Sequence, residues 1–160
     1  MKRTKPVAAQ SADLPQLKTL MYQLHQDHHQ QCPDHFKPAE EVAKEKDIAS
    51  YLNNPECLVY VVKDGDLVVG FVTGHFCELI SQVSQPVQMG SIDELYVLPE
   101  YRQQGVANLL TDKIEHSFDD YGVTQIFVEV WAFNKAAIEF YRKRCFANHI
   151  LCLRKAIESN

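Results

Sequence analysis

The stretch from Ile92 to Ile114 constrains the fold of this chain more than any other part of the sequence. Its first residues, 92–97, alternate in the manner of a β-strand, which Pro99 ends, and residues 100–104 form a polar loop. Beyond Gly105, hydrophobic residues recur at a spacing that lines one face of a helix: Val106, Leu109, Leu110, Ile114 and Phe118. A strand that enters a helix through a glycine-containing loop directs backbone N–H groups and the positive helix end at one point, which suits a phosphate group.

The composition indicates one folded domain over residues 1–160 and limits the classes of ligand. Hydrophobic residues make up 46% and charged residues 23%, which excludes a disordered chain. The net charge of −5 argues against a nucleic-acid partner, because such a partner requires a basic surface. A negative chain is compatible with a cationic or amine substrate.

The cysteines and the hydrophobic runs indicate a cytoplasmic protein. Five cysteines, an odd number without a Cys-x-x-Cys pair, fit a reducing compartment better than a disulfide framework. Cys145 and Cys152 are expected to be small buried residues and not nucleophiles, since no base lies at a recognisable spacing. No hydrophobic run reaches membrane-spanning length, and the first residues lack the core of a signal peptide, so no membrane partner is expected.

The N-terminal half is predicted to begin with a short strand and two helices. Ser11 and Asp13 are N-cap candidates for a helix whose hydrophobic stripe is Leu14, Leu17, Leu20, Met21 and Leu24. We expect a strand at Val7–Gln10, the end of the first helix and a loop within Gln23–Lys37, and a second helix at Ala39–Leu52.

Strands dominate the middle of the chain. The sequence Asp64-Gly65-Asp66 separates two β-branched runs, Leu58–Lys63 and Leu67–Glu78, and such a turn between such runs predicts a hairpin. A loop at Ser81–Met89 leads into the strand that begins at Ile92. Gly122 then ends the helix that follows Gly105.

The C-terminal part repeats the strand–helix pattern. We expect a strand at Thr124–Trp131, a helix capped by Asn134, and a last strand at Ile150–Lys155. The resulting order, β-α-α-β-β-β-α-β-α-β, predicts an α/β fold with a mixed central sheet and helices on both faces.

Two blocks of the sequence carry a family resemblance. The first is Arg102-Gln103-Gln104-Gly105-Val106-Ala107 with its lead-in Leu-Tyr-Val-Leu-Pro-Glu-Tyr, and the second is Val128-Glu-Val-Trp-Ala-Phe-Asn134 with Ala136-Ala137 and Phe140-Tyr141. Together they resemble the Arg/Gln-x-x-Gly-x-Gly/Ala motif and the second block of the GCN5-related N-acetyltransferase (GNAT) superfamily. That second block ordinarily ends in Leu-Gly-Phe, where this chain has Arg144-Cys145-Phe146.

The resemblance implies a GNAT fold and acetyl-CoA as co-substrate. Backbone N–H groups of the loop and first helical turn would hold the CoA pyrophosphate: Gln103, Gln104, Gly105, Val106, Ala107 and Asn108. Main-chain groups of Leu95, Tyr96 and Val97 would bind the pantetheine arm and the acetyl carbonyl, with the Val97 N–H as oxyanion donor, and Asn134 would contact the CoA arm. Neither a Gly-x-Gly-x-x-Gly fingerprint nor a P-loop is present.

Acetyl transfer to an amine requires removal of a proton from the amine and protonation of the departing thiolate. The resemblance implies Tyr141 as the general acid. Asp93 occupies the strand position of the catalytic carboxylate in polyamine and some aminoglycoside acetyltransferases, and Glu129 that of the base in ribosomal-protein N-terminal acetyltransferases. Glu94 is a third candidate if a β-bulge brings it to the face of Asp93. Each of these carboxylates could instead be an ordinary solvated strand residue.

A group of histidines lies before the second predicted helix. His25, His28 and His29 have the spacing of one helix face, and His35 follows. We interpret them as a polar helix end and not as a metal site, because no carboxylate–histidine signature accompanies them. In this family the first two helices border the acceptor site, so Gln26–Phe36 is expected to influence substrate choice.

The sequence therefore predicts direct transfer of acetyl from acetyl-CoA to a primary amine in a ternary complex, without a metal. A polyamine, an aminoglycoside, an amino acid and a protein N-terminus all remain open as acceptors, and a homodimer is compatible with the family. The alternatives are a non-catalytic acetyl-CoA sensor or partner-binding module of the same fold, and a generic α/β nucleotide-binding protein.

Overall fold

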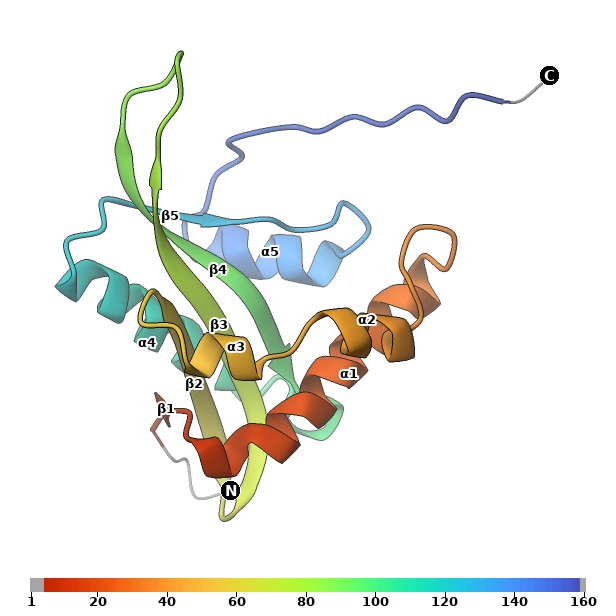
Figure 1. Cartoon of the computed structure of the whole chain (residues 1–160), viewed down its shortest axis with the longest axis vertical. Coiled ribbons are helices and arrows are strands. Elements are labelled where there is room, and N and C mark those ends of the chain that lie inside the picture. The colour runs from red at the N-terminus through yellow and green to blue at the C-terminus, as the bar shows by residue number, and fades with distance from the viewer. Residues whose placement is uncertain (1–4, 159–160) are drawn as a thin grey trace. The chain divides into compact units, whose positions relative to one another are not determined.

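The computed structural model describes residues 5–158 (Figure 1). Contacts within the chain divide it into two units, the first ending at Val128 and the second beginning at Glu129, and each is described by itself. The first unit contains β1 (Val7–Ala8), η1 (Ser11–Asp13), α1 (Leu14–Gln31), α2 (Ala39–Glu45), α3 (Ala49–Leu52), β2 (Cys57–Asp64), β3 (Leu67–Leu79), β4 (Val87–Val97), η2 (Pro99–Tyr101), α4 (Val106–Asp120) and β5 (Gln125–Val128). The second contains α5 (Lys135–Lys143).

The first unit is organised around a mixed sheet in the order β1-β2-β3-β4-β5. Strands β1 to β4 pair with one another antiparallel, and β5 pairs with β4 in parallel after the crossover through α4. The predicted hairpin joins β2 to β3, with Gly65 at a φ of 60° in its turn. The predicted mixed sheet is confirmed.

Helices cover both faces of this sheet. One face packs against the hydrophobic stripe of α4, whose Val106, Leu110, Ile114 and Phe118 are buried. Gly90 on β4 permits this close approach, because a Cβ there would lie 2.6 Å from the Phe118 ring. On the other face α1 contributes Leu17, Leu20 and Met21 to a core that includes Phe71 of β3 and Tyr96 of β4.

Two sequence expectations about the helices and strands are corrected. The helix expected at Ala39–Leu52 is interrupted at Lys46, whose backbone is extended (φ −121°, ψ 114°). Asp47 restarts the helix through local bonds, because its carboxylate accepts the Ala49 N–H and its carbonyl accepts the Ser50 hydroxyl. The strand expected at Thr124–Trp131 ends at Val128. The first helix ends at Gln31, within the expected range Gln23–Lys37.

The expectations for the C-terminal residues are also corrected. No strand forms at Ile150–Lys155, and Ile150, Leu151 and Leu153 are exposed. A β-branched run forms a strand only where a neighbouring strand supplies hydrogen-bond partners, which its own sequence does not determine. Cys145 and Cys152 are exposed and not buried as expected.

Candidate functional site

A β-bulge in β4 decides where the two candidate carboxylates of that strand point. Glu94 pairs with Thr73 of β3, and the next pair joins Ile92 to Gly74, so Asp93 has no partner in the ladder. The extra residue shifts the alternation of side chains along β4. The strand alternation in the sequence would have placed Asp93 and Glu94 on opposite faces, and the bulge removes that separation.

Hydrogen bonds show that both carboxylates lie on the α1 face of the sheet. Asp93 contacts His75 and Glu94 contacts Thr73, and these two β3 residues are two positions apart, which places them on one face. Phe71, two positions further, belongs to the core beneath α1. The bulge considered as a possibility from the sequence is therefore present.

Asp93 is held in a defined position while remaining partly accessible. Its Oδ2 lies 2.6 Å from His75 Nδ1, and its Oδ1 accepts the Ser91 hydroxyl at 2.9 Å. Its side chain is 18% exposed and that of His75 is 39% exposed. A carboxylate with fixed orientation and solvent access has the properties required of a general base.

Glu94 has a different environment from Asp93. Its side chain is only 6% exposed, and it accepts hydrogen bonds from the Thr73 hydroxyl and from the Lys46 ammonium. Burial, followed by the negative charges of Glu94 and Asp93, raises the pKa of Tyr51. Glu94 is thus already paired with a cation, whereas Asp93 is not paired with a lysine or arginine among residues 5–158.

The loop before α4 has the geometry of a phosphate-binding loop. Gln103 and Gly105 both have positive φ, 59° and 84°, and Gly105 is the N-cap of α4. The first helical hydrogen bond runs from the Leu109 N–H to the Gly105 carbonyl, so the N–H groups of the preceding turn point out of the helix end. These residues fit a pyrophosphate, because backbone donors and the helix dipole converge without side-chain obstruction.

Beyond the bulge, one edge of β4 is without a strand neighbour in the described part of the chain. Pairing with β5 ends at Ile92 and Val128, while β4 continues to Val97. The Leu98 N–H donates to β3, so the preceding amide, that of Val97, points to the opposite edge. Arg102 Nε donates to the Val97 carbonyl at 2.9 Å and fixes this segment. The Val97 N–H, predicted as the oxyanion donor, therefore faces the open edge.

The remaining predicted site residues belong to the second unit. Asn134 caps α5, its side-chain oxygen accepting the Ala137 N–H at 3.1 Å. Tyr141 is buried at 6% exposure, and its ring packs against those of Phe140 and Phe146. Glu129 follows directly after β5 and is exposed.

The sequence reasoning missed two residues at the carboxylates, Lys46 and His75. His75 could have been found from the strand alternation of β3 once the register against β4 was known. Lys46 could not, because it was assigned to the interior of one long helix and its extended backbone depends on the break before Asp47.

The histidines at the end of α1 contact the loop that follows. The His28 ring stacks on Phe36 with centroids 5.2 Å apart, and His29 Nδ1 lies 2.8 Å from the Phe36 carbonyl. Burial lowers the pKa of His28. Within residues 5–158, no three His, Cys, Asp or Glu side chains are grouped so that they could hold a metal ion, and no helix is long and apolar enough to cross a membrane.

Comparison with known proteins agrees with this geometry. Residues 20–146 match the model of the acetyltransferase (GNAT) family. An acetyltransferase from Vibrio fischeri is 52% identical, with a TM-score of 0.68, over 80% of this chain and 97% of that chain. No curated protein matches.

Two more distant structures share the fold. A mutant of the BH1408 protein from Bacillus halodurans is 18% identical, with a TM-score of 0.88, over 97% of this chain and all of that chain. The aminoglycoside N-acetyltransferase AAC(6')-Iy in complex with CoA is 14% identical, with a TM-score of 0.69, over 95% and 99% of the two chains. From the family match and the Vibrio fischeri relative, this chain belongs to the GNAT acetyltransferase family and is an acyl-CoA-dependent N-acetyltransferase.

Proposed function

We propose that the protein transfers acetyl from acetyl-CoA directly to a primary amine that binds on the α1 face of β4. The observation that carries the proposal is the bulge, which turns Asp93 to the face of Glu94 beside the open edge of β4. The aminoglycoside acetyltransferase structures with CoA and with a CoA bisubstrate analogue support an amine acceptor for this fold.

Acetyl-CoA would supply the acetyl thioester, and groups of the protein would bind the cofactor, orient it and stabilise the oxyanion. The loop from Gln103 to Asn108 binds the pyrophosphate, and the open main chain at residues 95–97 orients the pantetheine arm. The Val97 N–H stabilises the oxyanion. A preorganised donor of this kind can lower the activation free energy by about 3–4 kcal/mol. Arg102 keeps that segment in place through the Val97 carbonyl.

Asp93 is the base that we favour for the acceptor ammonium. It is accessible and oriented by His75 and Ser91, whereas Glu94 is committed to Lys46. Glu129 is the alternative base and Tyr141 the proposed acid for the departing thiolate. The free cysteines, five in all, support the reducing cytoplasm as the compartment.

The test is a thiol-release assay with acetyl-CoA over polyamines, aminoglycosides, amino acids and N-terminal peptides. We expect one class to give turnover, with Asp93→Asn lowering kcat by a factor of about 100 or more and Glu129→Gln leaving it nearly unchanged. The loss in Asp93→Asn should shrink as the pH rises, because the acceptor then arrives deprotonated. If Glu129→Gln lowered kcat strongly and Asp93→Asn left it nearly unchanged, Glu129 and not Asp93 would be the base. Saturable CoA binding with no thiol release from any amine would instead favour the sensor function.

A further inference from the structure

Lys46 places an ammonium group of the protein itself on the proposed acceptor face. Its Nζ donates to Glu94, whose side chain is buried to 6% exposure, while the Lys46 side chain is 38% exposed. The carboxylate is therefore the enclosed partner of the pair, and the ammonium is the accessible one. A carboxylate buried to this degree requires a positive partner, but that partner need not be Lys46.

Resting on the proposed function, we propose that Lys46 acts as an internal competitor for the acceptor, and that the true acceptor carries a second cationic group that displaces it from Glu94. Asp93 would then receive the reacting amine while Glu94 holds the second ammonium. The two carboxylates suit this division because the bulge places both on one face of the sheet. Among the described residues, Glu94 is paired with a lysine and Asp93 is not. Lys46 thereby determines specificity. The one ammonium of a singly charged amine binds at Asp93, and no second ammonium remains to displace Lys46 from Glu94.

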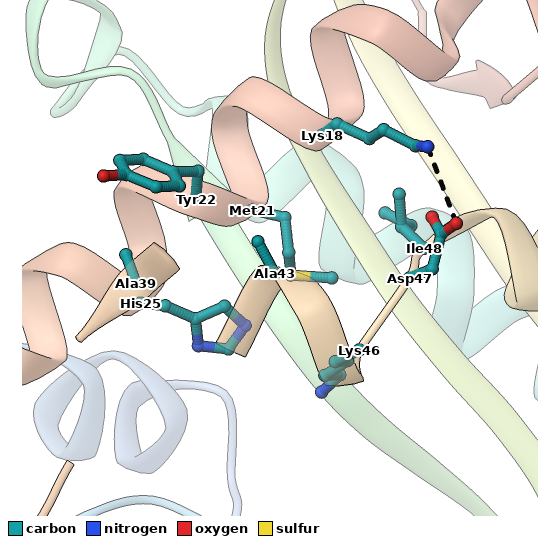
Figure 2. A pocket seen from close by; sticks show the side chains of 9 residues that line it. All are labelled: Lys18, Met21, Tyr22, His25, Ala39, Ala43, Lys46, Asp47 and Ile48. Atoms are coloured by element: carbon teal, nitrogen blue, oxygen red, sulfur yellow. Dashed lines mark ion pairs between the residues drawn. The ribbon is translucent and has the colours of Figure 1, made fainter. Parts of the chain in front are cut away.

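The backbone around Lys46 allows its side chain to move. Lys46 lies in the break between α2 and α3, with extended backbone, and not within a helical turn. The side chain also borders a cavity of about 100 Å³ between α1 and α2. Figure 2 shows this cavity, with Lys46 and His25 among the side chains that surround it.

His25 supplies a second position for the displaced ammonium. Its Nε2 is buried and has no hydrogen-bond partner in the described part of the chain. Burial, followed by the charge of Lys46, lowers the pKa of His25, which favours the neutral ring. In the tautomer that carries its proton on Nδ1, the Nε2 atom of His25 can accept a hydrogen bond from the displaced Lys46 ammonium. This bond would replace the one that Lys46 makes to Glu94.

The competition has a calculable effect on acceptor affinity. Because Glu94 is buried, its pair with Lys46 is at least as strong as a fully exposed ion pair, for which a population ratio of about five is typical. If only the fraction of molecules with Glu94 released can bind the second ammonium, the apparent affinity is reduced by that fraction. Removing the Lys46 charge should then strengthen binding of a diamine by at least about fivefold.

The test measures binding by titration calorimetry, with CoA present, of 1,3-diaminopropane and of propylamine as the single-charge control. Lys46→Met should bind the diamine at least about fivefold more tightly than the unaltered protein, and propylamine equally well. Lys44→Met is the matched control, since it removes an exposed lysine from α2 itself and should change neither affinity. Glu94→Gln should abolish the preference for the diamine, and Lys46→Arg, which retains the ion pair, should not gain affinity.

Equal diamine affinity in Lys46→Met and Lys44→Met would overturn the proposal, as would an equal gain for propylamine. If Lys46→Met does not fold, Lys46→Gln keeps a donor for Glu94 without the charge and carries the same expectations. Because binding is measured without turnover, failure of the proposed catalysis appears separately, as absent thiol release from protein that still binds the diamine.

Discussion

Replacing Gly105 with alanine tests the proposed phosphate-binding loop most directly. Gly105 has a φ of 84°, and a Cβ built there meets no atom within 4 Å. The substitution therefore introduces backbone strain without a steric clash, at a cost of about 1–2 kcal/mol for an L-residue in the left-handed region. For a chain of this size, 1 kcal/mol corresponds to a decrease in Tm of about 2–4 °C.

Gly122 provides a matched control at the other end of α4. Its φ is 79°, and it too has open space around the position of a Cβ. Gly122→Ala should lose the same stability as Gly105→Ala. Only Gly105→Ala should also weaken acetyl-CoA binding, because relief of the strain turns the N–H groups of the loop away from one another.

Thermal unfolding with and without acetyl-CoA separates the two effects. At a ligand concentration of a hundred times Kd, binding stabilises the unaltered protein by about 2.7 kcal/mol. A tenfold loss of affinity at the same concentration reduces that stabilisation to about 1.4 kcal/mol. If Gly105→Ala and Gly122→Ala showed equal ligand-induced stabilisation, the loop would not be the pyrophosphate site. If neither lost stability without ligand, the strain argument would fail.

Three further outcomes are expected. Tyr141→Phe should lower kcat by at least about tenfold while leaving CoA affinity within about twofold, as measured by steady-state kinetics and calorimetry, and an unchanged kcat would remove Tyr141 from the mechanism. Gly90→Ala should destabilise the fold by about 1–3 kcal/mol in urea unfolding, because its Cβ would overlap the Phe118 ring, and Phe118→Leu in the same chain should recover part of the loss. Burial alone would raise the pKa of the Asp13 carboxyl, but a hydrogen bond and the positive charge from Lys63, with a backbone N–H, lower it below 3.8. Since the folded-state pKa is lowered, this carboxylate stabilises the fold above about pH 4 and ceases to do so as the pH falls through the folded-state value. Asp13→Asn should therefore reduce the acid dependence of unfolding, and an unaltered acid profile would contradict this reasoning.

The elements that depend on local chemistry were predictable from the sequence. The hairpin at Gly65, the end of β4 before Pro99 and the start of α4 after Gly105 all follow from residues that restrict or permit particular backbone angles. The cap of α5 by Asn134 follows from the same kind of local bond. The proposed phosphate loop belongs to this group, because its geometry arises within a few consecutive residues.

The features that depend on pairing between distant segments were not predictable. The run at Ile150–Lys155 has a strand pattern but no strand, because a ladder needs a partner. Likewise, regular strand alternation predicts that Asp93 and Glu94 point to opposite faces of the sheet. Only the register of β4 against β3 reveals the bulge that brings them to one face.

The contact between Lys46 and Glu94 illustrates the same division. It joins a residue in a helix break to a residue in a strand, far apart in the chain. No sequence pattern identifies the two as partners. The sequence by itself therefore determined the family, the loop proposed for the co-substrate and the candidate carboxylates. The tertiary structure decided which carboxylate is accessible and which already holds a cation, because burial and ion pairing depend on segments that meet only in the folded chain.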